Sequence, residues 1–311
     1  MRRDLLHGTA MTKQPDKTAP GARKPPEFPH QSVFPLCGRA GDVRLVVGDS
    51  VAGMAQMPER CVDVIVTSPP YNLKKAYRTY DDSMPREEYL AWTREWAAAA
   101  SRVLAESGSL FLNVGGPPKD PWVPFDVLAV FREHLALQNV IHWVKSIAVE
   151  PNGDPRKVAT FGHYQPIQSP RYLNACHEFI FHLTHKGDVE LDRAAVGVPY
   201  QDKSNVSRWK AAAKDVHCRG NTWFIPYETI QSRDKERPHP ATFPAKLPEM
   251  CVRLHGLARV KLAMDPFLGL GSSAVACARL GVPFIGFDLD AGYVDEAASR
   301  VAKALGAPAK R

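Results

Sequence analysis

Four consecutive residues, Ser68-Pro69-Pro70-Tyr71, combine the groups that would hold and activate an amine. Each proline fixes its own φ angle and restricts the residue before it, so the backbone of Ser68 and Pro69 is held extended. Ser68 Oγ and the Pro69 carbonyl oxygen can then accept the two hydrogens of an amino group on an aromatic ring, which makes its nitrogen more nucleophilic. The structural alternative is a Pro-Pro turn followed by a core tyrosine.

A second chemical signature lies near the carboxyl terminus, in Asp265-Pro266-Phe267-Leu268-Gly269-Leu270-Gly271-Ser272-Ser273. Gly269 and Gly271 allow the close backbone approach that a bound ligand needs. Asp288 ends the next expected strand, where a carboxylate can accept both ribose hydroxyls of a nucleoside. The turn also satisfies the pattern G-x-G-x-x-A with an acid about twenty residues later, so a NAD-dependent oxidoreductase stays open as an alternative.

Taken together, these segments resemble the S-adenosylmethionine-dependent DNA methyltransferases that modify an exocyclic amino group. Residues 68–71 resemble the family's Ser/Asp/Asn-Pro-Pro-Tyr/Phe motif, and residues 265–271 resemble its Asp-Pro-Phe-x-Gly-x-Gly cofactor motif. Residues 239–248 look like the segment that precedes the family's glycine loop. Because the catalytic motif comes first, the order of motifs is similar to the family's β arrangement.

The resemblance implies that S-adenosylmethionine is the cofactor. It also implies that Ser68, Pro69, Pro70 and Tyr71 are catalytic, with the Tyr71 ring stacking on a flipped-out base. The residues expected to bind the cofactor are Asp49, Lys246, Asp265, Pro266, Phe267, Gly269, Gly271, Ser272 and Asp288. Asp288 departs from the glutamate more usual in the family, and capping a helix is an equal alternative for Asp49.

Methyl transfer to the amine nitrogen is expected to be direct, without a metal or a covalent enzyme intermediate. Ser68 stands where the family's adenine enzymes mostly carry aspartate, which favours the N4 amine of cytosine and leaves N6 of adenine as the alternative. None of the six cysteines follows a proline, so the Pro-Cys nucleophile used to methylate cytosine carbon-5 is missing. Cys176 and the histidines after it lack a second ligand pair, and no metal site is expected.

The elements that must position these residues alternate between apolar runs and helical periods. This predicts an α/β fold with a doubly wound, mostly parallel sheet, which is the Rossmann-like fold of the methyltransferases, with an inserted target-recognition region. The run that starts at Val62 suits a central strand covered on both faces. Strands are expected at 44–47, 62–66, 110–114, 139–144, 178–184, 260–264 and 284–287, and helices at 51–57, 88–104, 125–136 and 274–280.

The proline-rich, basic start of the chain predicts a disordered arm over residues 1–36. The catalytic half of the methyltransferase domain is expected at 37–185, the target-recognition region at 186–238 and the cofactor-binding half at 239–311. Residues 146–175 lose the alternation of strands and helices, which indicates a long functional loop.

A net charge of +7, from 40 Lys and Arg against 33 Asp and Glu, favours an anionic partner. The resemblance makes that partner double-stranded DNA. The residues expected to contact it are Lys74, Lys75, Arg208, Lys210, Lys214 and Arg219. A charged surface with no DNA role is the alternative for the cluster at 203–219, and a nucleic-acid-binding module without catalytic activity is a third class.

No apolar run is long enough to span a bilayer, and the N-terminus lacks the apolar region of a signal peptide. Scattered cysteines without a paired spacing suit a reducing compartment. We therefore expect a prokaryotic, cytoplasmic protein that associates with the nucleoid and has no membrane partner. A cognate restriction endonuclease would be a fitting second partner, and both a monomer and a homodimer stay open.

Overall fold

The central sheet places strands from both ends of the chain side by side. The computed structural model describes residues 26–36, 41–72, 82–150, 153–162, 169–204, 206, 215–226 and 242–306. The strands of the main sheet are β1 (Gln31–Pro35), β2 (Asp42–Val47), β3 (Val62–Thr67), β4 (Leu104–Val114), β5 (Ala136–Val144), β8 (His177–Thr184), β9 (Thr222–Phe224), β10 (Ala263–Asp265) and β11 (Phe284–Asp288). Their order in space is β1-β2-β11-β10-β3-β4-β8-β5-β9.

Five neighbouring strands, from β2 to β4, are mutually parallel. β1 is antiparallel to β2, and β8 is antiparallel to both of its neighbours, β4 and β5. This confirms the predicted mostly parallel sheet. Because β10 and β11 lie between β3 and β2, the two chemical signatures of the sequence leave the same carboxyl edge of the sheet.

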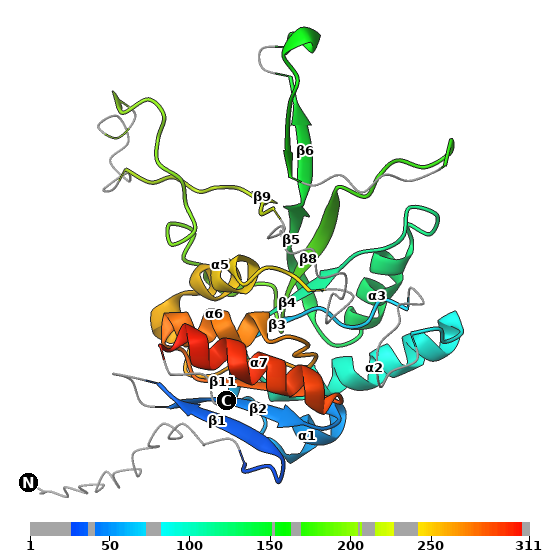
Figure 1. Cartoon of the computed structure of the whole chain (residues 1–311), viewed down its shortest axis with the longest axis vertical. Helices are drawn as coiled ribbons and strands as arrows, with labels where there is room; N and C mark the ends of the chain where they lie inside the picture. The colour runs from blue at the N-terminus through cyan, green and yellow to red at the C-terminus, as the bar shows by residue number, and fades with distance from the viewer. Residues whose placement is uncertain are drawn as a thin grey trace, which may run out of the picture.

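Helices cover both faces of the sheet (Figure 1). They are α1 (Ser50–Gln56), α2 (Arg86–Val103), α3 (Val123–Phe131), α5 (Lys246–His255), α6 (Ser272–Leu280) and α7 (Ala291–Ala304). Buried residues of α1, α2 and α3, among them Met54, Trp96 and Val127, share one hydrophobic cluster. Those of α5, α6 and α7, among them Leu247, Val275 and Ala297, share another.

The apolar run of β3 supplies both clusters. Val62 and Ile65 belong to the first cluster, whereas Val64 and Val66 belong to the second. The strand is therefore covered on both faces, as its continuous apolar run predicts. Asp63, which interrupts the run, accepts hydrogen bonds from the backbone N–H groups of Lys261 (2.7 Å) and Leu262 (3.0 Å) and so ties the start of β3 to the segment that leads into β10.

The predicted disordered arm over residues 1–36 is wrong for its last part. Gln31–Pro35 forms β1 at the edge of the sheet, and Phe28 and Leu36 on either side of it are buried. The Phe28 ring meets the Phe287 ring edge to face, with centroids 5.4 Å apart. A polar, proline-containing segment needs only a few apolar anchors and one strand partner to add an edge strand, and composition alone does not reveal these.

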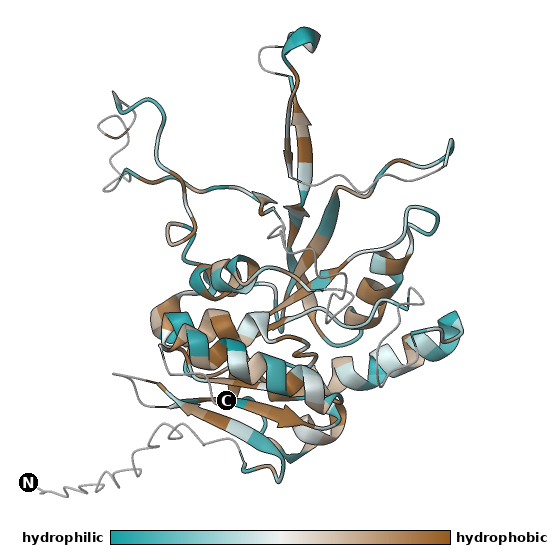
Figure 2. Cartoon of the chain, viewed as in Figure 1, coloured by the Kyte–Doolittle hydropathy of each residue, from teal (hydrophilic) through white to brown (hydrophobic). Residues whose placement is uncertain are grey.

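Residues 146–175 are not an irregular loop throughout. β6 (Ser146–Val149) and β7 (Ala159–Gly162) form an antiparallel hairpin, with the short 3-10 helix η2 (Pro155–Lys157) near its tip. The hairpin projects from the body of the molecule (Figure 1), and Figure 2 shows a hydrophilic tip above more hydrophobic strands. Three exposed apolar side chains on these strands are Ile147, Val149 and Phe161.

The predicted recognition region at 186–238 is partly built into the core. β9 pairs in parallel with β5, and Trp223 and Ile225 belong to a buried cluster. The indole N–H of Trp143 on β5 donates to the Ile225 carbonyl oxygen at 2.8 Å. The boundary between the recognition region and the methyltransferase domain is therefore less sharp than the sequence indicates, because apolar core residues are spaced among the charged ones.

Candidate active site

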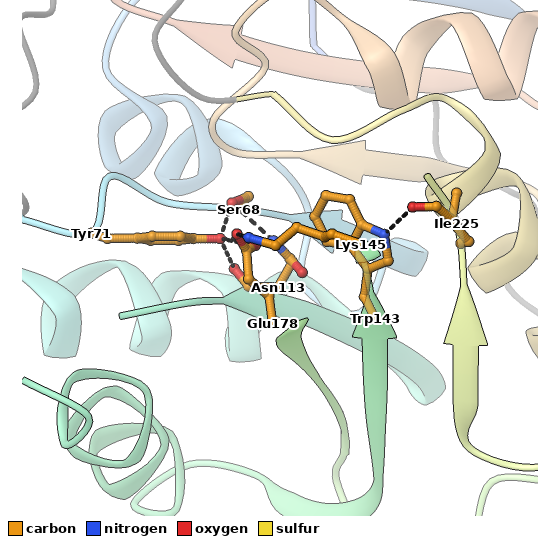
Figure 3. Close-up of polar contacts among 7 residues, drawn as sticks. All are labelled: Ser68, Tyr71, Asn113, Trp143, Lys145, Glu178 and Ile225. Carbon is orange, nitrogen blue, oxygen red and sulfur yellow. Dashed lines mark hydrogen bonds and ion pairs between the residues drawn. The ribbon is translucent and has the colours of Figure 1, made fainter. Parts of the chain in front are cut away.

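The Ser68-Pro69-Pro70-Tyr71 turn leaves β3 at the carboxyl edge of the sheet, and its two hydroxyl groups meet (Figure 3). Ser68 Oγ lies 2.7 Å from Tyr71 Oη. Tyr71 Oη also lies 3.1 Å from the backbone oxygen of Asn113 and 3.1 Å from Glu178 Oε2. Tyr71 is thus held at its hydroxyl end by groups from β3, β4 and β8.

Asn113, Lys145 and Glu178 extend this polar cluster. The Asn113 side-chain nitrogen donates to Tyr71 Oη and to Glu178 Oε2, each at 2.7 Å, and Lys145 Nζ donates to Glu178 Oε1 at 2.8 Å. The side chains of Lys145 and Glu178 are only 16% and 13% exposed. Asn113 Oδ1 is buried and has no hydrogen-bond partner among the described residues. A donor on an incoming substrate would satisfy it, since buried acceptors are normally paired.

The remainder of the turn is held from the side of α2. Tyr89 Oη donates to the Pro70 carbonyl oxygen at 2.8 Å. Asn72 has a φ angle of 56° and donates its backbone N–H to Asp82 at 2.8 Å and its side-chain amide to the Met84 carbonyl oxygen at 2.6 Å. These contacts give a fixed turn, as the two prolines predict.

The glycine-rich turn after β10 adopts the left-handed backbone that its glycines permit. Gly269 and Gly271 have φ angles of 49° and 73°, and a Cβ on Gly271 would lie 2.7 Å from the Ala297 side chain. Asp288 at the end of β11 accepts from the backbone N–H of Gly269 (2.8 Å) and of Asp290 (2.9 Å). Each carboxylate oxygen keeps a further lone pair, so Asp288 can still accept two ribose hydroxyls. Burial raises the pKa of Asp288.

Asp265 is more deeply buried than a residue that contacts the cofactor directly is expected to be. Its carboxyl group is 1% exposed and accepts from Thr67 Oγ1 (2.7 Å), Ser273 Oγ (2.8 Å) and the Phe267 backbone N–H (3.0 Å). Burial raises its pKa to about 7. Asp265 therefore joins β3, β10 and α6, and it positions the glycine turn from beneath.

The other predicted cofactor residues lie around this turn in different settings. Asp49 is exposed and caps α1 by accepting from the Ala52 N–H at 2.8 Å. Pro266 is buried, Ser272 begins α6, and Lys246 begins α5, where it pairs with Glu249 at 3.5 Å. The Phe267 ring packs against Trp92 and Trp96, with ring centroids 5.4 and 5.1 Å away.

Of the predicted DNA contacts, only Arg219 falls within the described residues. Its side chain is exposed, and Nε donates to the Val196 carbonyl oxygen at 2.9 Å. Lys74, Lys75, Arg208, Lys210 and Lys214 lie outside the described residues.

A cavity of about 150 Å³ opens beside the turn. It is lined by Tyr71, Asn72, Arg86, Tyr89, Pro117, Lys119, Asp120 and Val123. Arg86 Nη1 pairs with Asp126 at 2.8 Å, and Arg86 also pairs with Asp120, so one wall of this cavity is charged and fixed.

Sequence reasoning missed Asn113, Lys145 and Glu178 as site residues. Asn113 is a polar residue inside an apolar strand and is 1% exposed. Lys145 follows β5, and Glu178 lies at the start of β8, which runs antiparallel. The sequence held a signal only for Asn113, which is a polar residue near the carboxyl end of a buried strand. Glu178 gave no such signal, because β8 is antiparallel and its first residues, rather than its last, lie at the edge of the sheet that carries the site.

A model of the N6_N4_Mtase family, described as DNA methylase, matches residues 62–299. The chain belongs to this DNA methylase family. The match spans the Ser-Pro-Pro-Tyr turn, the glycine-rich turn and the sheet between them, and it sets aside the NAD-dependent oxidoreductase.

Individual relatives of this DNA methylase agree with the family. The chain is 25% identical over 263 residues to the type II methyltransferase M.HpaI of Haemophilus parainfluenzae, across 84% of this chain and 74% of that protein. Its fold matches the PvuII DNA methyltransferase, described as cytosine-N4-specific, with a TM-score of 0.62, 18% identity and coverage of 90% and 95% of the two chains. A Thermus thermophilus protein solved in complex with S-adenosyl-L-methionine matches with a TM-score of 0.54, 22% identity and coverage of 85% and 94%.

None of the helices in the described part of the DNA methylase is both long and apolar enough to cross a membrane. Over the same residues, no group of three or more His, Cys, Asp or Glu side chains is arranged to hold a metal ion. His182, which the sequence groups with Cys176, instead lies in the core between Asn139 and Ser109.

Proposed function

We propose that this DNA amino-methyltransferase transfers a methyl group from S-adenosylmethionine to the exocyclic N4 amine of a flipped cytosine in duplex DNA. The observation that carries the proposal is Ser68 Oγ at the end of β3, one strand away from the glycine turn and two strands away from Asp288. A hydroxyl acceptor in place of a carboxylate favours cytosine over adenine. The family includes enzymes for both amines, so N6 of adenine is the second candidate.

The chain's own residues supply positioning and polarisation. Ser68 Oγ and the Pro69 carbonyl oxygen accept the two amine hydrogens, which draws the nitrogen lone pair out of conjugation with the ring. The Tyr71 ring stacks on the extruded base and offsets part of the stacking that it loses on leaving the duplex. The bound cofactor supplies an electrophilic methyl group on a positively charged sulfur.

Residues at the ends of β10 and β11 would hold that cofactor. Asp288 accepts the ribose hydroxyls, and Gly269 and Gly271 let the ligand approach the backbone. Asp265 fixes the turn through Thr67 and Ser273 rather than by direct contact. We assign five further residues to the surroundings of the same ligand: Asp49, Lys246, Pro266, Phe267 and Ser272.

Duplex DNA is the partner that this function requires, and the positive net charge supports it. We assign DNA contacts to Lys74, Lys75, Arg208, Lys210, Lys214 and Arg219. A type II activity implies a cognate restriction endonuclease and a prokaryotic cytoplasm, where the nucleoid is the substrate.

Product analysis tests the proposal directly. The protein is incubated with S-adenosylmethionine carrying an isotopically labelled methyl group and with a pool of duplexes, and the DNA is digested to nucleosides for mass spectrometry. Labelled N4-methylcytosine is the expected product. Labelled N6-methyladenine would show that the target base is adenine instead of cytosine. DNA binding without any labelled nucleoside would identify a module without catalytic activity.

A further inference from the structure

We propose that Glu178 is a positioning residue for methyl transfer: it orients Ser68 through the Tyr71 hydroxyl and takes up, along the same path, the proton that the amine loses. This role rests on the proposed function, because it concerns the same site. It gives the Tyr71 hydroxyl a task that the stacking of its ring does not require.

The donors around Glu178 determine where each proton points (Figure 3). Lys145 Nζ and the Asn113 side-chain nitrogen can only donate, and both donate to the Glu178 carboxylate. Tyr71 Oη lies 3.1 Å from both Glu178 Oε2 and the Asn113 backbone oxygen. We assign its proton to Glu178, because a carboxylate that accepts from Lys145 has no proton to give and a charged acceptor makes the stronger hydrogen bond.

The direction of the next hydrogen bond follows. With its own proton committed to Glu178, Tyr71 Oη accepts from the Asn113 amide at 2.7 Å and from the Ser68 hydroxyl at 2.7 Å. The Ser68 proton therefore points into the cluster. The Asn113 side-chain nitrogen also donates to Ser68 Oγ, at 3.4 Å, which leaves one lone pair of Ser68 Oγ for the substrate amine. Without this chain of donors the Ser68 hydroxyl could rotate its proton toward the amine, where two donors would oppose each other.

The cluster is also rigid and largely dry. Asn113 is 1% exposed, and Trp143, which lies on β5 two residues before Lys145, is fixed through its bond to the Ile225 carbonyl oxygen. Lys145 Nζ lies 5.8 Å from the centroid of the Trp143 ring. Low exposure strengthens each charge-assisted bond and keeps the proton directions fixed before substrate arrives.

The same path balances the charges of the reaction. As the nitrogen–methyl bond forms and the carbon–sulfur bond breaks, the electron pair of the broken bond stays on sulfur and the nitrogen becomes positive. Its proton passes to Ser68 Oγ while the Ser68 proton passes to Tyr71 and the Tyr71 proton to Glu178. One positive sulfur and one negative carboxylate thus become neutral together, and the methylated amine is neutral.

Two conservative variants separate this role from packing. Tyr71→Phe keeps the stacking ring and removes the hydroxyl, and Glu178→Gln keeps the shape of the side chain and removes its charge. Each should lower kcat at least about tenfold, with unchanged dissociation constants for S-adenosylmethionine and for duplex DNA. Because both interrupt one path, the double variant should be no slower than the slower single variant. Glu133→Gln, which removes an exposed carboxylate paired with Arg94, is the control and should keep the wild-type kcat.

Thermal unfolding of each variant precedes the kinetics, because Glu178→Gln leaves Lys145 without its carboxylate. Should that variant not fold, Tyr71→Phe decides alone. A wild-type kcat in Tyr71→Phe overturns the role of Glu178, and so do losses that multiply in the double variant. A wild-type protein that methylates no DNA overturns the proposed function itself, which is a different result.

Discussion

Ser68 and Asp288 stand at the ends of two strands separated only by β10, yet their side chains face different parts of the reaction. Ser68 contacts Tyr71 and the polar cluster, whereas Asp288 contacts the backbone of the glycine turn. Substituting each one should therefore change a different measured quantity.

Ser68→Ala removes one of the two acceptors for the reacting amine. We expect kcat to fall by about a hundredfold or more, since an acceptor that matters most in the transition state affects turnover rather than binding. Single-turnover methylation combined with calorimetric binding of S-adenosylmethionine checks this. Turnover at the wild-type rate would remove Ser68 from the mechanism.

Asp288→Ala should weaken cofactor binding, because two ribose hydroxyls lose acceptors worth about 1–3 kcal/mol in total. The carboxylate also accepts from Gly269 and Asp290, so Asp288→Asn helps to separate the loss of charge from the loss of the turn contacts. Calorimetry on both variants, with circular dichroism as a control for folding, measures the effect. An unchanged dissociation constant in both would place Asp288 outside the cofactor site.

At the scale of elements, α1 depends on a single cap. The Asp49 carboxylate accepts from the Ala52 N–H at 2.8 Å, and no acidic residue follows in the first turn. Asp49→Ala should lower the free energy of unfolding by about 1 kcal/mol, whereas Asp49→Asn should retain the cap and most of the stability. If Asp49 also contacts the cofactor, both variants will bind S-adenosylmethionine more weakly, and in Asp49→Asn this loss of affinity will occur without a loss of stability. Urea unfolding and calorimetry on the two variants distinguish these roles.

A buried polar chain ties α5 to three strands. The Asn139 amide donates to His182 Nδ1 at 3.0 Å, so His182 Nε2 donates to Ser109 Oγ at 2.9 Å, and Ser109 Oγ donates to His255 Nδ1 at 2.9 Å. Burial lowers the pKa of His182 to about 3 and that of His255 to about 4, from an ordinary value of 6.5. Both imidazoles are therefore neutral in the folded protein.

This chain predicts a loss of stability in mild acid. Since the unfolded protein binds the histidine protons first, the stabilisation is complete above about pH 6.5 and is lost as the pH falls from there toward 4 and 3, by about 1.4 kcal/mol per pH unit for each histidine. His182→Gln should flatten the decline of unfolding free energy between pH 6.5 and 5 measured in urea. The exposed His30→Gln is the control, and an unaltered slope in the His182 variant would refute the assignment.

The sequence predicted most of the strands that run through the core, but it missed the helices α5 and α7 and the short strands whose partners come from elsewhere in the chain. Continuous apolar runs located β3, β4 and β11, and the proline and glycine turns located both halves of the site. β1, β6, β7 and β9 were missed because short strands gain their stability from neighbours rather than from their own pattern. Lys145 and Glu178 could not be paired from sequence, since the antiparallel β8 that brings them together is a property of topology.

For the whole molecule, the location of the DNA-binding face is the main consequence of the fold. The hairpin of β6 and β7 projects from the body of the molecule (Figure 1), and its tip carries cations. These are Arg156 and Lys157, both paired with Asp154. Arg219 is a further exposed cation, located before β9. Either surface could lie on the duplex.

Salt dependence of binding discriminates between them. Each phosphate contact contributes about 0.9 to the slope of log affinity against log salt concentration, so Arg219→Ala should reduce that slope by about one. The matched variant Arg156→Ala should leave the slope unchanged if DNA lies along 186–238. The reverse outcome, measured by fluorescence anisotropy across a salt series, would move the contact face to the hairpin.

The position of β10 and β11 in the middle of the sheet also bears on how the protein is made. Asp63 is joined to residues 198 and 199 positions later in the chain. While the ribosome synthesises those residues, the facing edges of β2 and β3 have no partner strands. Unpaired strand edges invite contacts between chains, and pairings this distant in sequence form slowly. The two halves of the sheet therefore join only after β10 and β11 have emerged, so the synthesis of these two strands is the step at which the enzyme acquires both its core and its site.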